Sequence, residues 1–329
     1  MNSNEILTYT FEALAYISFF AIIASLIRKK DKTGLAEFLS AATFGMLLEI
    51  GNIAFAHTYA YGAGFLVSIN GVPIAIGLGW AVIIHGSMKL TDSYKADWKK
   101  KPFFDALTAF LIDISMDAVA IRLGLWKWII PMDAEWFGVP YENLAAWILV
   151  VLSFSFTMRY LRIINPGNKI KALLYMASPV LSYILLIAGL MAYGFLSILP
   201  YSALNFASGI NFKLIPPPDV LYNPAVQIAK LALLSALVGL TVRFAYYIVR
   251  NGRNKSKDNN NNLSSLALIG IHAFFIAAIL IEGMHTRIPQ LLHVGLLSLA
   301  LHIFIHHKPG LYPIFNLLSF KSATTSSKR

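Results

Sequence analysis

The sequence predicts an all-α membrane protein, a polytopic bundle of about nine transmembrane helices. The composition carries this prediction: of 329 residues, 57% are hydrophobic and only 13% are charged. A soluble domain has just under half apolar and about a quarter charged residues. A water-soluble globular enzyme is therefore excluded. Because the chain has no cysteine, a disulfide-stapled secreted module and cysteine chemistry are excluded as well.

Long apolar runs give the individual helices. Runs of about 18 to 25 apolar residues are typical of membrane-spanning helices, since the hydrocarbon core is about 30 Å thick. Such runs cover residues 6–27, 35–56, 72–88, 103–123, 144–164, 172–199, 224–249, 263–282 and 289–305. The third run is short and rich in glycine, and the ninth is also short. No basic segment precedes the first run, which is long enough to span, so we expect an uncleaved first helix.

The basic residues indicate the orientation of these helices. Of the 27 lysines and arginines, 22 fall in or beside the loops on one side of the predicted membrane. Arg122, Lys127, Lys213 and Arg287 belong to the other side, and Lys230 lies inside a span. By the positive-inside rule the N-terminus is outside and the C-terminus is cytoplasmic, as in a multi-pass protein of the plasma membrane. The net charge of +11 then needs no nucleic-acid partner.

A polar segment divides the chain near its end. Residues 251–262, NGRNKSKDNNNN, lack apolar periodicity and predict a flexible cytoplasmic linker. We expect a seven-helix core at 1–250, a terminal helix pair at 263–307 and a cytoplasmic tail at 308–329.

Three carboxyl groups within the predicted spans point to a site. A carboxylate at membrane depth costs roughly 2.5 to 3.5 kcal/mol. Glu49 and Asp117 each lie 14 residues from the cytoplasmic start of their span, which places both about 21 Å into the membrane. Asp113 is four residues from Asp117, on the same helix face. Two carboxyl groups so close cannot both be charged cheaply, so one should stay protonated near neutral pH and could act as a general acid.

The alternative for this pair is structural. An ion pair or hydrogen-bond network with Arg122, Lys230 or Asn52 would hold helices together instead. For Asp105, near the cytoplasmic end and beside Lys101, we favour a structural role.

The outer loop after the fourth span is rich in tryptophan. Trp126, Trp128, Trp136 and Trp147 are four of the six tryptophans in the chain. An aromatic belt at the membrane interface would explain one of them. Their density favours a lid of aromatic rings over the outer mouth of the bundle, above Glu49 and Asp117.

The histidines near the end of the chain do not indicate a metal site. His302 and His306 are four residues apart, which is a possible ligand spacing. No carboxylates cluster at that depth, so we interpret both as solvated histidines at the cytoplasmic interface. Phosphate-loop, zinc-protease and serine-hydrolase motifs are missing from the sequence.

Three stretches of the sequence resemble a known family. The stretches EIGNIAFAHTYAYG, GVPIAIGLGWAVIIHGS and DISMDAVAIRLGLWKWIIPMDAEWFGVPYENLAAW are similar to the carotenoid-biosynthesis membrane proteins that include bisanhydrobacterioruberin hydratase and the gamma-carotene hydratases. The resemblance covers roughly residues 35–165. The matching positions are Asp113, Asp117, Gly124, Trp126, Trp128, Phe137, Gly138, Val139, Pro140, Asn143 and Trp147. The chain has Ala118, Leu144 and Ala146 where the family usually has Pro, Phe and Gly.

The resemblance implies a hydro-lyase of lipid metabolism that hydrates the isopropylidene end of a carotenoid or other apolar isoprenoid. Asp113 or Asp117 would be the general acid, and the other, or Glu49, would orient water. Asn143 would hydrogen-bond the water or the new hydroxyl group. The aromatic and neighbouring polar residues expected at the substrate are Asn52, Trp126, Trp128, Trp136, Pro140 and Trp147. No metal or other cofactor is expected.

Two other functions stay open. A membrane prenyltransferase of a lipid diphosphate would need a second Asp-rich motif to hold magnesium, and the sequence has none. A carrier or proton-coupled transporter could use Asp113, Asp117 and Glu49 as a proton relay. It should show broken helices in matching halves of the chain, and no clear pair is found.

Overall fold

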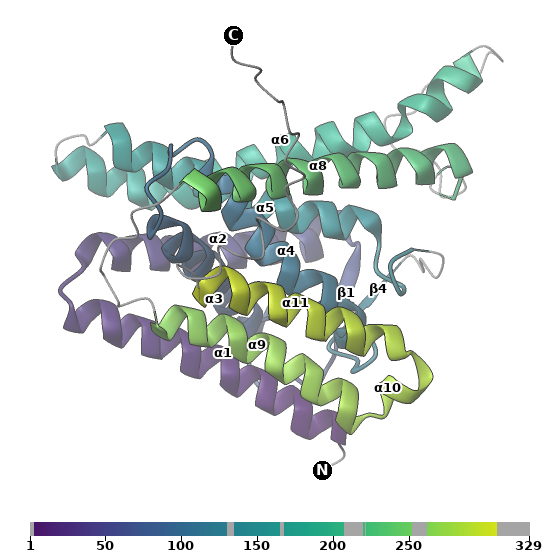
Figure 1. The fold of residues 1–329 in the computed structure, drawn as a ribbon, viewed down its shortest axis with the longest axis horizontal. Helices are drawn as coiled ribbons and strands as arrows, with labels where there is room; N and C mark the ends of the chain where they lie inside the picture. The colour runs from purple at the N-terminus through teal and green to yellow at the C-terminus, as the bar shows by residue number, and fades with distance from the viewer. Residues whose placement is uncertain are drawn as a thin grey trace, which may run out of the picture.

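The computed structural model describes residues 3–129, 135–164, 168–206, 220, 222–251 and 262–307. Long helices run side by side through this part of the chain, with two short two-stranded sheets at the ends of helices (Figure 1). The helices are α1 (Ser3–Arg28), α2 (Lys32–Gly51), α3 (Ile74–Asp92), α4 (Lys101–Ala120), α5 (Tyr141–Ile164), α6 (Asn168–Phe206), α8 (Pro224–Asn251), α9 (Asn262–Ile281), α10 (Met284–Arg287) and α11 (Pro289–His307). A π-helical turn, η1 (Asn52–Ala56), extends α2.

The all-α membrane bundle expected from the sequence is confirmed. Within the described residues, seven helices are long and apolar enough to cross a membrane: α1, α2 with η1, α3, α5, α6, α8 and α9. The other two predicted spans are also helices. The apolar part of α11 is shorter, residues 289–305, and α4 carries three aspartates. Nine spans and the placing of the termini stay predictions.

Helix α4 lies at the centre of the bundle. It packs against α3, α5, α8, α9 and α11, and 17 of its 20 residues are buried. In Figure 1, α1 and α9 lie on one side of this centre, and α6 and α8 on the opposite side. A helix surrounded by others can carry aspartates, because protein partners replace the lipid that would otherwise surround them.

Two glycines bring α2 and α3 into close contact. A Cβ atom on Gly45 would lie 2.6 Å from the Trp80 Cβ atom, and one on Gly77 would lie 2.2 Å from the Met46 Sδ atom. Small residues at such positions let helix backbones approach closely. This contact sets Glu49, one turn after Gly45, beside Trp80.

The small sheets lie at one end of α2, α3 and α4. Strand β1 (Tyr59–Tyr61) pairs antiparallel with β4 (Trp126–Trp128), and β2 (Ser68–Ile69) pairs with β3 (Val72–Pro73). Strands β1 and β4 lie at the same end of the bundle as the N-terminus (Figure 1). The β1–β4 pair therefore joins the loop after α2 to the loop after α4.

The terminal helices pack against the rest of the bundle. Helix α9 contacts α1, α3 and α4, and α11 contacts α4. Most of the predicted linker and the whole predicted tail lie outside the described residues, so the division of the chain at 251–262 stays a prediction.

Candidate functional site

A pocket opens among the helices at the end of the bundle that carries β1 and β4. Its volume is about 1070 Å³, part of which is open to the outside. Seven of the residues expected at a site line it: Glu49, Asn52, Asp117, Trp126, Trp128, Asn143 and Trp147. The pocket wall is otherwise mostly apolar and aromatic, so its few polar groups stand out.

Glu49 is held in place by three hydrogen-bond donors. Its carboxyl group accepts bonds from the Tyr59 hydroxyl, from the Tyr61 hydroxyl at 2.6 Å and from the Trp80 Nε1 atom at 2.7 Å. Burial and the neighbouring Glu49 carboxyl raise the pKa of both phenols well above its usual range, so both remain donors. Three such bonds offset part of the cost of burying a negative charge on this carboxyl group.

The β1–β4 pair explains how the two tyrosines reach Glu49. Tyr59 is opposite Trp128 and Tyr61 is opposite Trp126. Alternate residues of a strand point to the same face, so the two phenols and the two indoles stand together over the pocket. The turn before β1 is fixed by Asn52, whose amide donates to the Thr58 hydroxyl at 2.7 Å and accepts from the Thr58 backbone N–H at 3.2 Å.

Asp113 and Asp117 form the second acidic centre. Their carboxyl groups are close enough to interact electrostatically, and both aspartates are buried. The Asn143 side-chain amide donates to Asp117 and, at 3.5 Å, to Asp113. Asp117 lines the pocket and Asp113 does not. Asp117 is also close enough to Glu49 for their charges to interact, so the two acidic centres belong to one site.

The remaining expected residues lie apart from the pocket wall. Trp136 donates from its Nε1 atom to the Ile114 carbonyl at 2.9 Å. Pro140 accepts a hydrogen bond from the Asn143 backbone N–H at 2.9 Å, just before α5 begins. Neither lines the pocket. Both hold the outer loop and α5 in place, and thereby position Asn143.

The structural partners expected for the aspartate pair are wrong. Lys230 is paired with Glu142 at 2.5 Å and with Glu135 at 3.5 Å. Arg122 donates to the backbone carbonyls of Ala118 and Phe137. Asn52 bonds Thr58 instead, and the observed partner of the pair is Asn143.

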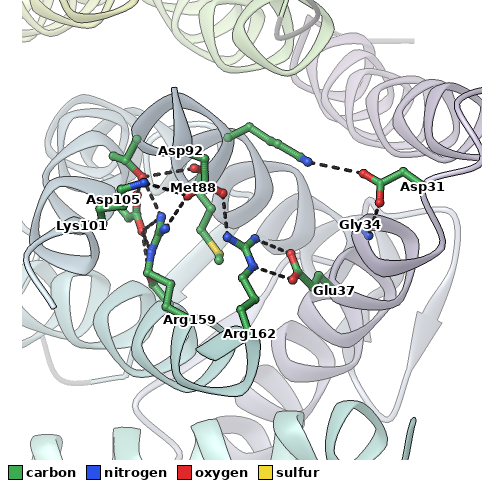
Figure 2. Close-up of polar contacts among 12 residues, drawn as sticks. Asp31, Gly34, Glu37, Met88, Asp92, Lys101, Asp105, Arg159 and Arg162 are labelled. Atoms are coloured by element: carbon green, nitrogen blue, oxygen red, sulfur yellow. Dashed lines mark hydrogen bonds and ion pairs between the residues drawn. The ribbon is translucent and has the colours of Figure 1, made fainter. Parts of the chain in front are cut away.

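The structural role expected for Asp105 agrees with its contacts, although its main partner differs. Its Oδ2 atom accepts bonds from Arg159 Nη2 at 2.8 Å and from the Ser155 hydroxyl at 2.5 Å. Lys101, the expected partner, is 3.5 Å from Asp92 instead. Figure 2 shows this cluster, in which Arg159 and Arg162 both reach Asp92, and Arg162 also reaches Glu37. The cluster ties α2, α3, α4 and α5 together at the end of the bundle opposite the pocket.

The interpretation of His302 as a solvated interface histidine is wrong. Its side chain is fully buried, and its Nδ1 atom is 3.0 Å from the Nε2 atom of His272 on α9. The side chain of His306 lies outside the described residues. In the described parts of the chain, no three His, Asp or Glu side chains gather as metal ligands would.

Sequence reasoning missed four residues of interest. Tyr59, Tyr61 and Trp80 donate to Glu49, and Glu12 on α1 is a fully buried carboxyl group that accepts from the Leu66 N–H at 2.9 Å. The alternation Tyr59-x-Tyr61 is a strand signal that could have indicated two phenols on one face. No local pattern indicates which carboxyl group they reach.

Comparison with known proteins identifies the family. The model of the family described as carotenoid biosynthesis protein matches residues 10–210, which is more than half of the chain and includes every pocket-lining residue except Ile271. Searches of curated proteins and of solved structures found no match. A pocket of aromatic and apolar side chains in a membrane bundle is suited to an isoprenoid ligand, and the chain belongs to the carotenoid biosynthesis protein family.

Proposed function

We propose that the protein is an integral membrane hydratase that adds water to the terminal isopropylidene double bond of a carotenoid. The observation that supports this most is that Asn143 joins Asp113 and Asp117, and that Asp117, Asn143 and Glu49 line one mostly apolar pocket. Hydration of an unactivated alkene needs an acid, a stabilised cation and a positioned water molecule. The site offers a residue type for each.

The acid in this proposal is the Asp113–Asp117 pair. Two buried carboxyl groups that share one amide donor hold one proton between them, because two like charges so near each other are costly in low dielectric. Asp117 lines the pocket and therefore delivers the proton, and Asp113 keeps the proton available. The proton goes to the less substituted carbon of the double bond, whose π electrons form the new C–H bond and leave a tertiary carbocation.

Glu49 and the aromatic rings stabilise that cation. In this proposal Glu49 carries the negative charge. Its three donors hold the carboxyl group in place at the pocket, so no reorganisation is needed when the cation forms. The rings of Trp126 and Trp128 offer faces that attract a cation. So do those of Trp80 and Trp147, which are tilted by 41° with ring centroids 4.3 Å apart.

Water completes the reaction. A water molecule held by the Asn143 amide attacks the cation and forms the C–O bond. Its surplus proton passes to the Asp117 carboxylate, which restores the shared proton of the pair. The net change is the addition of one water, and the charge of the site is the same before and after.

The test is expression of the protein in cells that accumulate an acyclic carotenoid with isopropylidene ends, followed by mass analysis of the pigments. We expect a product heavier by one water. Asp117→Asn should lower turnover by about 10²- to 10⁴-fold, as for loss of a general acid, while the protein stays in the membrane.

The matched control is Asp97→Asn, the same chemical change at an exposed loop position between α3 and α4, which should leave turnover unchanged. If membranes with folded protein give no hydrated carotenoid, the hydratase proposal fails. If Asp117→Asn works like Asp97→Asn, the assigned acid is wrong.

A further inference from the structure

The pocket runs lengthwise along the helices. Three helices line it with residues spaced i, i+3, i+4 and i+7, which form one stripe on a helix face. The stripes are Phe11, Leu14, Ala15 and Ser18 on α1; Ile76, Gly79, Trp80 and Ile83 on α3; and Asn143, Ala146, Trp147 and Val150 on α5. Seven residues of helix rise about 10 Å. The space therefore fits a thin chain lying parallel to the helices.

The polar groups gather at one end of this space. Asn143 begins the α5 stripe, and Glu49, Asp117 and the β1–β4 pair lie at the same end. Toward the other end, the stripes finish in Ser18, Ile83 and Val150. A ligand with a reacting terminus and a long apolar remainder would have its terminus among the carboxyl groups and its remainder along the stripes.

Gly79 is the one pocket-lining glycine among the described residues, and the fold does not explain it. A Cβ atom there would meet nothing within 4 Å, unlike the Cβ atoms of Gly45 and Gly77, which would clash with the facing helix. Its backbone is helical and φ is not positive. Glycine within a helix is less favourable than alanine. Neither packing nor backbone conformation therefore requires it.

We propose that Gly79 determines substrate specificity: the missing side chain keeps open the part of the pocket that the extended polyene chain occupies behind its reacting end. The ligand class is a flat, unsaturated isoprenoid rod, which passes Trp80 and continues along α3. Because it concerns the substrate of the same site, the inference rests on the proposed function.

The experiment substitutes Gly79 by Ala, Val and Leu in the full-length protein, reconstituted in phospholipid vesicles with lycopene as the probe. Four of the six tryptophans line the pocket, so a bound polyene should quench tryptophan fluorescence. This readout is independent of turnover. Gly239→Leu on α8 is the matched control, because a Cβ atom there also meets nothing within 4 Å and the residue does not line the pocket.

We expect lycopene binding to weaken step by step from Gly79→Ala to Gly79→Val to Gly79→Leu. Gly239→Leu should bind lycopene within about twofold of the parent. Gly79→Ala should bind it more weakly than the parent, and Gly79→Leu roughly ten- to hundredfold more weakly, the effect of forcing a side chain into occupied space. Hydration should fall in the same order. The thermal midpoint of every variant is measured in the same vesicles, and Gly79→Val keeps the test decisive if Gly79→Leu does not fold.

Two results would overturn the inference: lycopene binding by folded Gly79→Leu that equals the parent, or no saturable quenching in the parent. If the parent binds lycopene and the series loses binding while no hydrated product forms, the inference holds and the proposed function fails. If hydration occurs and Gly79→Leu retains both binding and turnover, the proposed function holds and the inference about Gly79 fails.

Discussion

Arg159 provides the sharpest test of what holds the bundle together. This α5 side chain is 3% exposed and donates to Asp105, Asp92, Thr91 and Ser155. Asp105 is fully buried, and without Arg159 it would keep only hydroxyl partners for its charge. Breaking a buried ion pair by removing one partner costs about 3–5 kcal/mol. We therefore expect Arg159→Met to lower the free energy of unfolding by that amount.

A denaturant titration of the purified protein in detergent, followed by circular dichroism, measures this change. Adding Asp105→Asn to Arg159→Met should recover part of the loss, because it removes the unpaired charge, and the double-mutant cycle gives the coupling energy. Lys89→Met is the control, since its pair with Asp31 is partly exposed at 3.6 Å and such pairs contribute about 0–1 kcal/mol. A loss for Arg159→Met as small as that of Lys89→Met would refute the reasoning.

Three further substitutions test the site and its supports. Glu49→Gln removes the carboxylate that the proposed mechanism requires and places an amide among three donors, so hydration should fall by about 10²- to 10³-fold with unchanged membrane content. Undiminished product in the pigment assay would contradict the role of Glu49. Lys230→Met leaves the buried Glu135 without its cation, so the denaturant titration should show a free energy of unfolding lower by about 3 kcal/mol or more, partly recovered by Glu135→Gln. An unchanged denaturation midpoint would show that this pair does not stabilise the fold. Gly77→Leu forces a side chain against Met46 and should lower the free energy of unfolding by about 1–3 kcal/mol. A denaturation midpoint equal to that of Gly79→Leu would contradict the difference in packing between the two glycines.

The length of the apolar runs was enough to predict most of the helices. Every predicted span coincides with a helix, because a 20-residue apolar run in lipid has few alternatives to helix. The aspartates of α4 also follow from spacing, since Asp113 and Asp117 share a face by helix geometry alone. To expect Glu49 and Asp117 near each other required only the helical rise and a correct orientation of the two helices, and both residues line one pocket.

Contacts between distant segments could not be predicted in this way. Tyr59 reaches Glu49 only because β1 pairs with β4, and no charge or repeat near Tyr61 signals a partner 65 residues later. Lys230 and Arg122 were plausible partners for the aspartates by charge, but the choice among several carboxyl groups depends on how helices rotate and tilt when packed. The error for His302 has the same cause. Its place near the end of the last predicted span suggested the membrane interface, but its burial against α9 depends on how the helices pack.

The two polar clusters of α4 have a consequence for how such a protein can change over time. Asp105 and Asp117 are twelve residues apart, about 18 Å along one helix. One end of the helix thus secures the assembly through Arg159, while the other end carries the reactive groups. Substitutions around the pocket need not weaken the ion-pair cluster, because effects at well-separated sites are nearly additive. Stability and selectivity can therefore be altered by separate sets of mutations, which gives a lineage room to acquire new isoprenoid substrates without first losing its fold.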